Sequence, residues 1–326
     1  MSSIFDKIQD NLSNITFSPK TLKLSDLKYD NIDSLLNSLK DIHTLTSLDL
    51  SSMNINEKNF NKFYQLIINN PSLTKLNLYD NDIYNNELIL ISKLLMNKDC
   101  KLTELNLSYN TFEDESVIKL AKALEKNKTL TKLDLSLNHI SDDGMNALSN
   151  MIKVNKTLTY LSLYDNYYIT DIGLLSMLEA LKFNTTLTYI NLGLKHGEMP
   201  GQLGLYNMYH IRPNDEIVKA VCEVIKTNHT LTTLWLTSNF IDKLDLLYDA
   251  LTLNKTIKEL GVYHVMFKPW DSDRIMCNYG DDYEDACLNY DVDHDHGEDY
   301  MEKQTDFFAE NPNFAYKIYK LLKERE

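Results

Sequence analysis

Two hydrophobic periods alternate along most of the chain. In the segment LTKLDLSLN, residues 130–138, leucines alternate with polar residues, which predicts a short strand with one buried face. Upstream of it, Val117, Leu120, Ala121 and Leu124 follow the i, i+3, i+4, i+7 spacing of an amphipathic helix. The sequence therefore predicts short strands that alternate with helices, each element having one apolar face.

The strand pattern, leucine-x-x-leucine-x-leucine-x-x-asparagine, recurs in register eight times. The first apolar positions of the copies are Leu45, Leu73, Leu102, Leu130, Leu158, Leu187, Leu231 and Ile257. These positions are 28, 29, 28, 28, 29, 44 and 26 residues apart. The asparagine slot is degenerate near both ends, at Met53 and Val265. Since one strand and one helix cannot bury both apolar faces alone, we expect neighbouring copies to stack.

This array resembles the leucine-rich repeat family in its longer, ribonuclease-inhibitor-like form, from Leu22 to Val265. The resemblance implies an α/β solenoid with the shape of a horseshoe, with parallel strands on the concave face and helices on the convex face. It also implies that the motif asparagine turns inward and hydrogen-bonds the backbone between coils.

The resemblance sets the expected domain organisation. Residues 1–44 would form an N-terminal cap with a degenerate first repeat, and residues 45–265 would form the repeats. Residues 266–326 would carry an acidic segment and a C-terminal capping helix. The long sixth copy predicts a loop insertion at residues 193–215, which is rich in glycine, and such loops often project over a binding face.

The helix starts carry their own signals. Ser141, followed by Asp142 and Asp143, is expected to cap a helix, with negative charge near its positive end. Gly144 and Gly173 occupy equivalent places at two helix starts. We expect these glycines to serve the architecture rather than a functional site.

An Asn-x-Thr triplet precedes five of the strands, beginning at Asn127, Asn155, Asn184, Asn228 and Asn254. It matches the acceptor pattern for N-glycosylation. The N-terminus has no basic region followed by an apolar region, however, so we expect no secretory signal. We interpret the triplet as the turn from helix to strand, in which Asn adopts left-handed backbone and Thr begins the strand.

The concave surface, formed by the polar strand positions, is where we expect a partner to bind. Tyrosine and tryptophan beside carboxylates are typical of protein-binding surfaces, because aromatic side chains provide large and rigid contact areas. The candidate partner-binding residues are Asp49, Tyr79, Asp80, Glu104, Asp134, Tyr160, Tyr164, Asp165, Tyr189, Trp235 and Tyr263. Among them Trp235 is the sharpest candidate, and the expected partner is a protein with basic patches.

The net charge of −14 is concentrated in one segment. Residues 271–302 contain twelve acidic residues and one basic residue, so this segment has a net charge of −11. The rest of the chain has a net charge of −3. A solvated acidic loop is the default interpretation.

A metal site in this acidic segment is the alternative. Four residues occupy positions 1, 3, 5 and 12 of a calcium-binding loop, namely Asp291, Asp293, Asp295 and Glu302. His296 stands where such a loop needs glycine, which weakens the match. A zinc site through Cys277, Cys287, His294 and His296 lacks the paired-cysteine spacing of structural zinc sites.

Other function classes have no support in the sequence. G-x-S-x-G, H-E-x-x-H, C-x-x-C and P-loop motifs are absent, so we expect neither an enzyme nor a cofactor. The acidic charge and the lack of a basic stripe argue against nucleic-acid binding, and no apolar run is long enough to span a membrane. The sequence favours a monomeric, cytoplasmic, non-catalytic interaction scaffold. The alternatives are a calcium-responsive interaction module, working through residues 291–302, and a regulatory or inhibitory subunit of an enzyme.

Overall fold

A computed structural model describes residues 21–23, 36, 43, 45–193, 215–237, 243–263, 265–267, 276–277 and 312–325 of the 326-residue chain. The chain divides into two compact units, and each is described by itself. The first unit lies within residues 1–162 and 166–168, and the second within residues 163–165 and 169–326.

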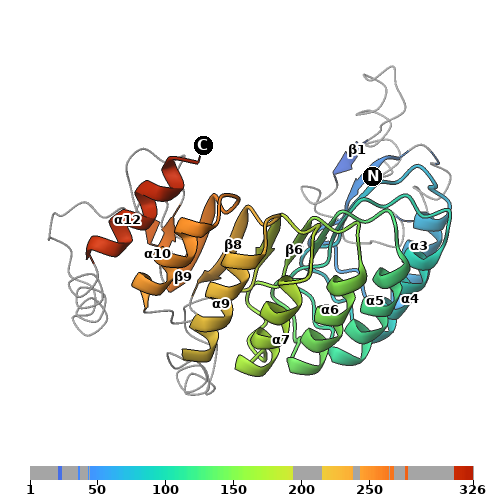
Figure 1. Cartoon of the computed structure of the whole chain (residues 1–326). Coiled ribbons are helices and arrows are strands. Elements are labelled where there is room, and N and C mark those ends of the chain that lie inside the picture. Colours follow the sequence, from blue (N-terminus) through green and yellow to red (C-terminus); the bar gives the residue numbers. More distant parts are fainter. Residues whose placement is uncertain are drawn as a thin grey trace, which may run out of the picture. The chain divides into compact units, whose positions relative to one another are not determined.

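The first unit alternates short parallel strands with helices. Its strands are β1 (Thr21–Lys23), β2 (Ser47–Asp49), β3 (Lys75–Asn77), β4 (Glu104–Asn106), β5 (Lys132–Asp134) and β6 (Tyr160–Ser162). Its helices are α3 (Glu57–Ile68), α4 (Asn85–Met96), α5 (Asp114–Lys126) and α6 (Asp142–Val154). Each strand pairs in parallel with the next, and the helices lie along one side of the sheet (Figure 1).

The second unit repeats this arrangement and then ends it. Its helices are α7 (Asp171–Leu181), α9 (Asp215–Thr227), α10 (Leu244–Leu253) and α12 (Pro312–Lys323). Its strands are β7 (Tyr189–Asn191), β8 (Thr233–Thr237), β9 (Glu259–Tyr263), β10 (Val265–Phe267) and β11 (Met276–Cys277). Strands β7, β8 and β9 are parallel, whereas β10 runs antiparallel to β9 and β11 antiparallel to β10. The expected α/β leucine-rich-repeat solenoid fold is confirmed.

Val265 differs from its expected role. The sequence pattern placed it in a degenerate asparagine slot, but in the structure it begins β10 and lies opposite Val262 of β9. The chain therefore reverses direction after β9 instead of continuing into another coil, and strands β10 and β11 follow where a further parallel strand would be.

The leucines of the pattern form the core. Leu48, Leu76, Leu105 and Leu133 share one register across β2 to β5, and each is at most 2% exposed. Leu22 of β1 continues the row, because it pairs with Leu48. Strands of only three residues bury little area each, so the free energy from apolar burial accumulates by stacking copies.

The motif asparagines link neighbouring coils, as the resemblance implied. The Asn110 amide nitrogen donates to the Leu78 carbonyl of the preceding coil at 3.1 Å, and its Oδ1 accepts the Ile83 N–H, also at 3.1 Å. Asn81 makes the same two kinds of contact, with the Leu50 carbonyl at 3.0 Å and the Ile55 N–H at 2.8 Å. Each asparagine also donates to a carbonyl of its own coil, so it satisfies backbone groups of two coils in a buried place.

The Asn-x-Thr triplets have the same purpose at the other turn. The Oδ1 of Asn155 accepts the N–H groups of Thr157 and Leu158, both at 2.8 Å, while its amide donates to the Leu124 carbonyl at 2.7 Å. Asn127 makes the corresponding three bonds. All five triplet asparagines are buried, at no more than 6% exposure, so they offer no accessible nitrogen to a glycan.

The left-handed backbone expected at these asparagines was wrong. Asn127 has φ −66° and ψ 137°, and Asn155 has φ −67° and ψ 133°, which is extended backbone. Asparagine is needed here because its side chain joins two coils, and not because it tolerates positive φ.

The expected Ser141 cap also differs in its partner. Ser141 occupies the N-cap of α6, but its side chain makes no capping bond within that helix. Its hydroxyl donates instead to Asp114 of the preceding coil, which also accepts the Ser141 N–H at 2.8 Å. Gly144 leaves room for this carboxylate, because a Cβ added there would lie 2.4 Å from Asp114 Oδ1.

Helix α12 packs against α10, with Ile318 and Leu322 buried. Beyond its end, the Arg325 guanidinium donates to the carbonyls of Leu251 and Ile257. Leu251 lies three residues before Asn254, and Leu124 lies three residues before Asn127, so the two leucines are equivalent. The Leu124 carbonyl accepts a hydrogen bond from the amide of Asn155 in the next coil. Arg325 therefore supplies the donor that a further coil would have supplied. None of the helices in the described part of the chain is long and apolar enough to cross a lipid bilayer.

We expect Asn155→Ala to lower the free energy of unfolding by about 2–4 kcal/mol, because it leaves two N–H groups and one carbonyl without their buried partner. Equilibrium urea unfolding followed by circular dichroism measures this change. The matched control is Asn150→Ala on the exposed side of α6, which should alter the unfolding midpoint little. Equal effects of the two substitutions would contradict the role assigned to Asn155.

Candidate functional site

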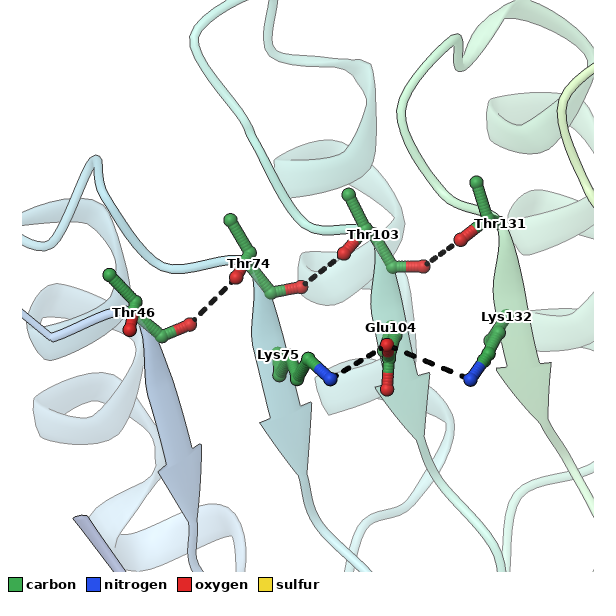
Figure 2. Close-up of polar contacts among 7 residues, drawn as sticks. All are labelled: Thr46, Thr74, Lys75, Thr103, Glu104, Thr131 and Lys132. Atoms are coloured by element: carbon green, nitrogen blue, oxygen red, sulfur yellow. Dashed lines mark hydrogen bonds and ion pairs between the residues drawn. The ribbon is translucent and has the colours of Figure 1, made fainter. Parts of the chain in front are cut away.

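A ladder of threonines holds the starts of strands β2 to β5 in the first unit (Figure 2). The Thr46 carbonyl accepts both the N–H of Thr74, at 2.8 Å, and its hydroxyl, at 2.9 Å. Thr103 and Thr131 repeat the hydroxyl contact on the preceding coil at 3.1 and 3.0 Å. Each step thus adds a side-chain bond to the backbone ladder, which fixes the register of the strands that carry the exposed side chains.

The side of the sheet opposite helices α3 to α6 contains a hollow beside this ladder. We call this side of the sheet the strand face of the first unit. The hollow has a volume of about 290 Å³. It is lined by Ser47, Leu48, Asp49, Lys75, Leu76, Asn77, Glu104, Leu105, Asn106, Lys132, Asp134 and Tyr160. Four of the predicted residues, Asp49, Glu104, Asp134 and Tyr160, are therefore brought together.

Three charged residues directly precede the central leucine of β3, β4 and β5, and we call them the ionic row (Figure 2). Glu104 Oε1 lies 2.9 Å from the Lys75 ammonium and 3.8 Å from that of Lys132. The lysine side chains are more than half exposed, at 54% and 56%, so solvent screens these ion pairs. The row orders two cationic groups around one carboxylate.

The residues that directly follow the central leucine form a second row, the Asx row, made of Asp49, Asn77, Asn106 and Asp134. In each of them, Oδ1 accepts the N–H of the residue two positions later, at distances of 2.9 to 3.1 Å. This turn holds the side chains at the carboxyl ends of the strands. Burial raises the pKa of the Asp134 carboxyl, while hydrogen bonds from Ser136 act in the opposite direction.

The carboxyl edge of the sheet carries residues with positive φ. Ser52, Asp80, Tyr109 and Leu137 have φ between 53° and 56°, and each directly precedes the asparagine slot. Asp80 Oδ2 accepts the Ser52 hydroxyl at 2.6 Å. The tight turn at this position carries the chain from the strand to the inward-turned asparagine. It places Asp80 and Tyr109 at the carboxyl edge of the sheet, just after β3 and β4, and we call this edge the rim.

Aromatic side chains gather on this rim. The rings of Tyr79 and Tyr109 stack with centroids 5.7 Å apart, and they are 38% and 51% exposed. A separate aromatic group follows β5 and β6, where His139, Tyr167 and Tyr168 pack together and the centroids of the two tyrosine rings are 4.3 Å apart. Tyr79 and Asp80 were predicted as binding residues, and they lie on the rim rather than in the lining of the hollow.

The remaining predicted residues belong to the second unit. Tyr189 in β7 and Trp235 in β8 are half-buried, as are Tyr164 and Asp165. Tyr263 ends β9, and its side chain lies outside the described part of the structure. The structure thus separates the eleven candidates into a set on the first unit and a set on the second.

Lys75 and Lys132 were missed by the sequence analysis. Both occupy the strand position that Glu104 and Tyr160 also occupy, so the register of the repeats already placed them on the strand face. Their position could have identified them, because Lys75, Glu104 and Lys132 occupy the same place in consecutive repeats.

The predicted metal residues Asp291, Asp293, Asp295 and Glu302 lie outside the described residues, as do most of the 193–215 insertion and the acidic segment. In the described part of the chain, no group of three His, Cys, Asp or Glu side chains is arranged to hold a metal ion.

The pKa of Asp134 leads to a pH prediction. The folded protein holds this proton more tightly than the unfolded chain, so stability decreases as the pH rises from the unfolded pKa through the folded pKa. Asp134→Asn keeps the bonds from Ser136, as Asn106 does with Ser108, and it removes the buried charge.

We therefore expect Asp134→Asn to unfold at a higher urea concentration than the wild type at about pH 7, and to lose this advantage at about pH 3, where both side chains are neutral. Unfolding curves at the two pH values measure the effect. Glu125→Gln, at an exposed site on α5, is the matched control. An advantage for Asp134→Asn that does not depend on pH would be inconsistent with the burial of its charge.

Comparison with known proteins agrees with the repeat structure. A family model described as "Leucine Rich repeat" matches residues 98–121 and 126–149. No curated protein sequence matches the chain. Among solved structures, leiomodin-1 actin-binding site 2 is 20% identical over 60% of this chain and 91% of that chain, with a TM-score of 0.36. An internalin from Listeria monocytogenes strain 4b F2365 is 17% identical over 71% of this chain and 65% of that chain, with a TM-score of 0.39.

The matched family model, the recurring strand and helix, and the inward asparagines between coils all lead to one conclusion. The repeats of this chain are leucine-rich repeats.

Proposed function

We propose that this chain is a non-catalytic scaffold that binds a partner protein across the strand face of the first unit. Leucine-rich repeats are typical protein–protein interaction modules, in which the strand positions between the leucines form the binding surface. The observation that carries the proposal is the hollow, which gathers charged side chains and Tyr160 on strands held by the threonine and asparagine ladders.

The rigidity of this surface supports binding. Each side chain in the hollow stands on a strand whose register is fixed at several points, so little backbone order has to be gained when a partner docks. Tyr160 adds an aromatic ring at the β6 end of the hollow, and aromatic side chains are enriched among the residues that contribute most to protein interfaces.

The chemistry of the partner follows from the charges. The hollow contains three carboxylates, from Asp49, Glu104 and Asp134, and two lysines, Lys75 and Lys132. Its net charge is therefore −1, and a partner with both basic and acidic groups suits it better than a uniformly basic one. Tyr164, Tyr189 and Trp235 of the second unit are proposed as further contact residues.

The test compares two double variants of the full chain. Affinity capture from the cells that make the protein, followed by quantitative mass spectrometry, should show a partner that is retained by the wild type. Tyr160→Ala with Lys132→Ala should reduce that partner about tenfold or more, as expected when an aromatic residue and a charged residue of an interface are truncated together.

The matched control is Lys119→Ala with Lys122→Ala, at exposed positions of α5 on the opposite side of the unit. It should retain the partner. Circular dichroism must show that both variants remain folded. An identical set of partners for the wild type and both variants would refute binding at the strand face.

A further inference from the structure

The Asx row presents a fixed order of polar atoms across the sheet. Because Oδ1 of each member is used by its own turn, the atom left for a ligand is Oδ2 in Asp49 and Asp134 and the amide nitrogen in Asn77 and Asn106. From β2 to β5 the order is therefore acceptor, donor, donor, acceptor. The two acceptors carry negative charge, and the two donors are neutral.

The ionic row reinforces the centre of this pattern. Lys75 and Lys132 line the same hollow, and both ammonium groups are drawn toward Glu104 on β4. The middle of the hollow thus offers two ammonium groups and two amides as donors around one carboxylate. An incoming carboxylate can accept bonds from these donors, whereas an incoming cation would meet the lysines.

The spacing matches an extended chain that crosses the strands. Neighbouring strands lie about 4.8 Å apart, so three steps from β2 to β5 separate Asp49 from Asp134 by about 14 Å. An extended peptide advances about 3.3 Å per residue, so its residues i and i+4 lie about 13 Å apart on one face, with residue i+2 between them. Position i+2 then faces the donors at the centre.

We propose that the partner of the strand face is an extended segment with a basic–x–acidic–x–basic pattern, which lies across β2 to β5. Its two basic side chains bind Asp49 and Asp134, and its acidic side chain binds the donors of Asn77, Asn106 and the two lysines. This inference rests on the proposed function and names the partner chemistry of the same site. The segment carries a net charge of +1, which balances the net charge of −1 in the hollow.

The same arrangement selects against related segments. A segment with the charges inverted places its carboxylates against Asp49 and Asp134, and its cation against Lys75 and Lys132. A segment of the same composition in another order keeps the net charge but loses the register. Specificity therefore comes from repulsion in the wrong register as well as from attraction in the correct one.

Fluorescence anisotropy with the purified full chain tests the proposal. The probe is a labelled peptide containing Arg-Thr-Glu-Thr-Arg between Gly-Ser flanks, and it is compared with Arg-Arg-Thr-Thr-Glu and Glu-Thr-Arg-Thr-Glu in the same flanks. At an ionic strength of about 0.1 M, we expect the first peptide to bind roughly tenfold more tightly than either of the others.

Two variants then assign the contacts. Asp49→Asn with Asp134→Asn should weaken binding of the first peptide roughly tenfold, while Lys119→Ala with Lys122→Ala should leave it unchanged. Asp49→Lys with Asp134→Lys should reverse the preference in favour of Glu-Thr-Arg-Thr-Glu, which a merely unfolded variant could not do.

The proposal is overturned if the three peptides bind equally, or if the first does not bind at about 1 mM peptide. This outcome is distinct from failure of the proposed function. If the capture experiment still depends on Tyr160 and Lys132, the strand face binds a protein of another pattern. If capture does not depend on them, the strand face itself is the wrong surface.

Discussion

Buried asparagine side chains that join neighbouring coils are the interaction on which this structure depends. A strand of three residues offers few backbone pairs, and inside the array both turns of a coil are covered by its neighbour. The N–H and carbonyl groups in those turns must therefore find partners without water, or cost about 1–3 kcal/mol each. Asn110 meets this need after the strand, and Asn155 meets it before the strand. Each coil is stable because its neighbours complete it.

The same requirement explains how the second unit ends. Within the described residues no further parallel strand follows β9, and β10 pairs antiparallel with its edge instead. On the helical side, the Arg325 guanidinium reaches the Leu251 carbonyl, which corresponds to carbonyls that receive asparagine amides in earlier coils. An arginine that follows a helix packed on the last coil can thus take the place of the next coil's asparagine, because only a donor at that place is needed.

The leucines, threonines and asparagines of each repeat are needed to hold the fold. Side chains that can contact a partner therefore differ from repeat to repeat only at the positions between them. Two such positions per strand face away from the core, and stacking sets them side by side at the spacing of the sheet. In the first unit this brings together Lys75, Glu104 and Lys132 in one row and four Asx residues in another. A partner therefore encounters a pattern fixed in two directions, along the strand and across it.

The sequence by itself determined the repeats and the buried leucines, because each follows from a local period or spacing. The inward asparagines were implied by the resemblance to the leucine-rich repeat family. The sequence also placed Asp49, Glu104, Asp134 and Tyr160 on the strand face, where the structure has them. Only the tertiary structure decided the partners: Ser141 binds Asp114, Asn155 binds the Leu124 carbonyl, and Glu104 binds two lysines. These contacts join residues about one repeat apart, so they depend on how coils stack in register. A pattern confined to one repeat contains no information on which atoms of the next repeat will face it.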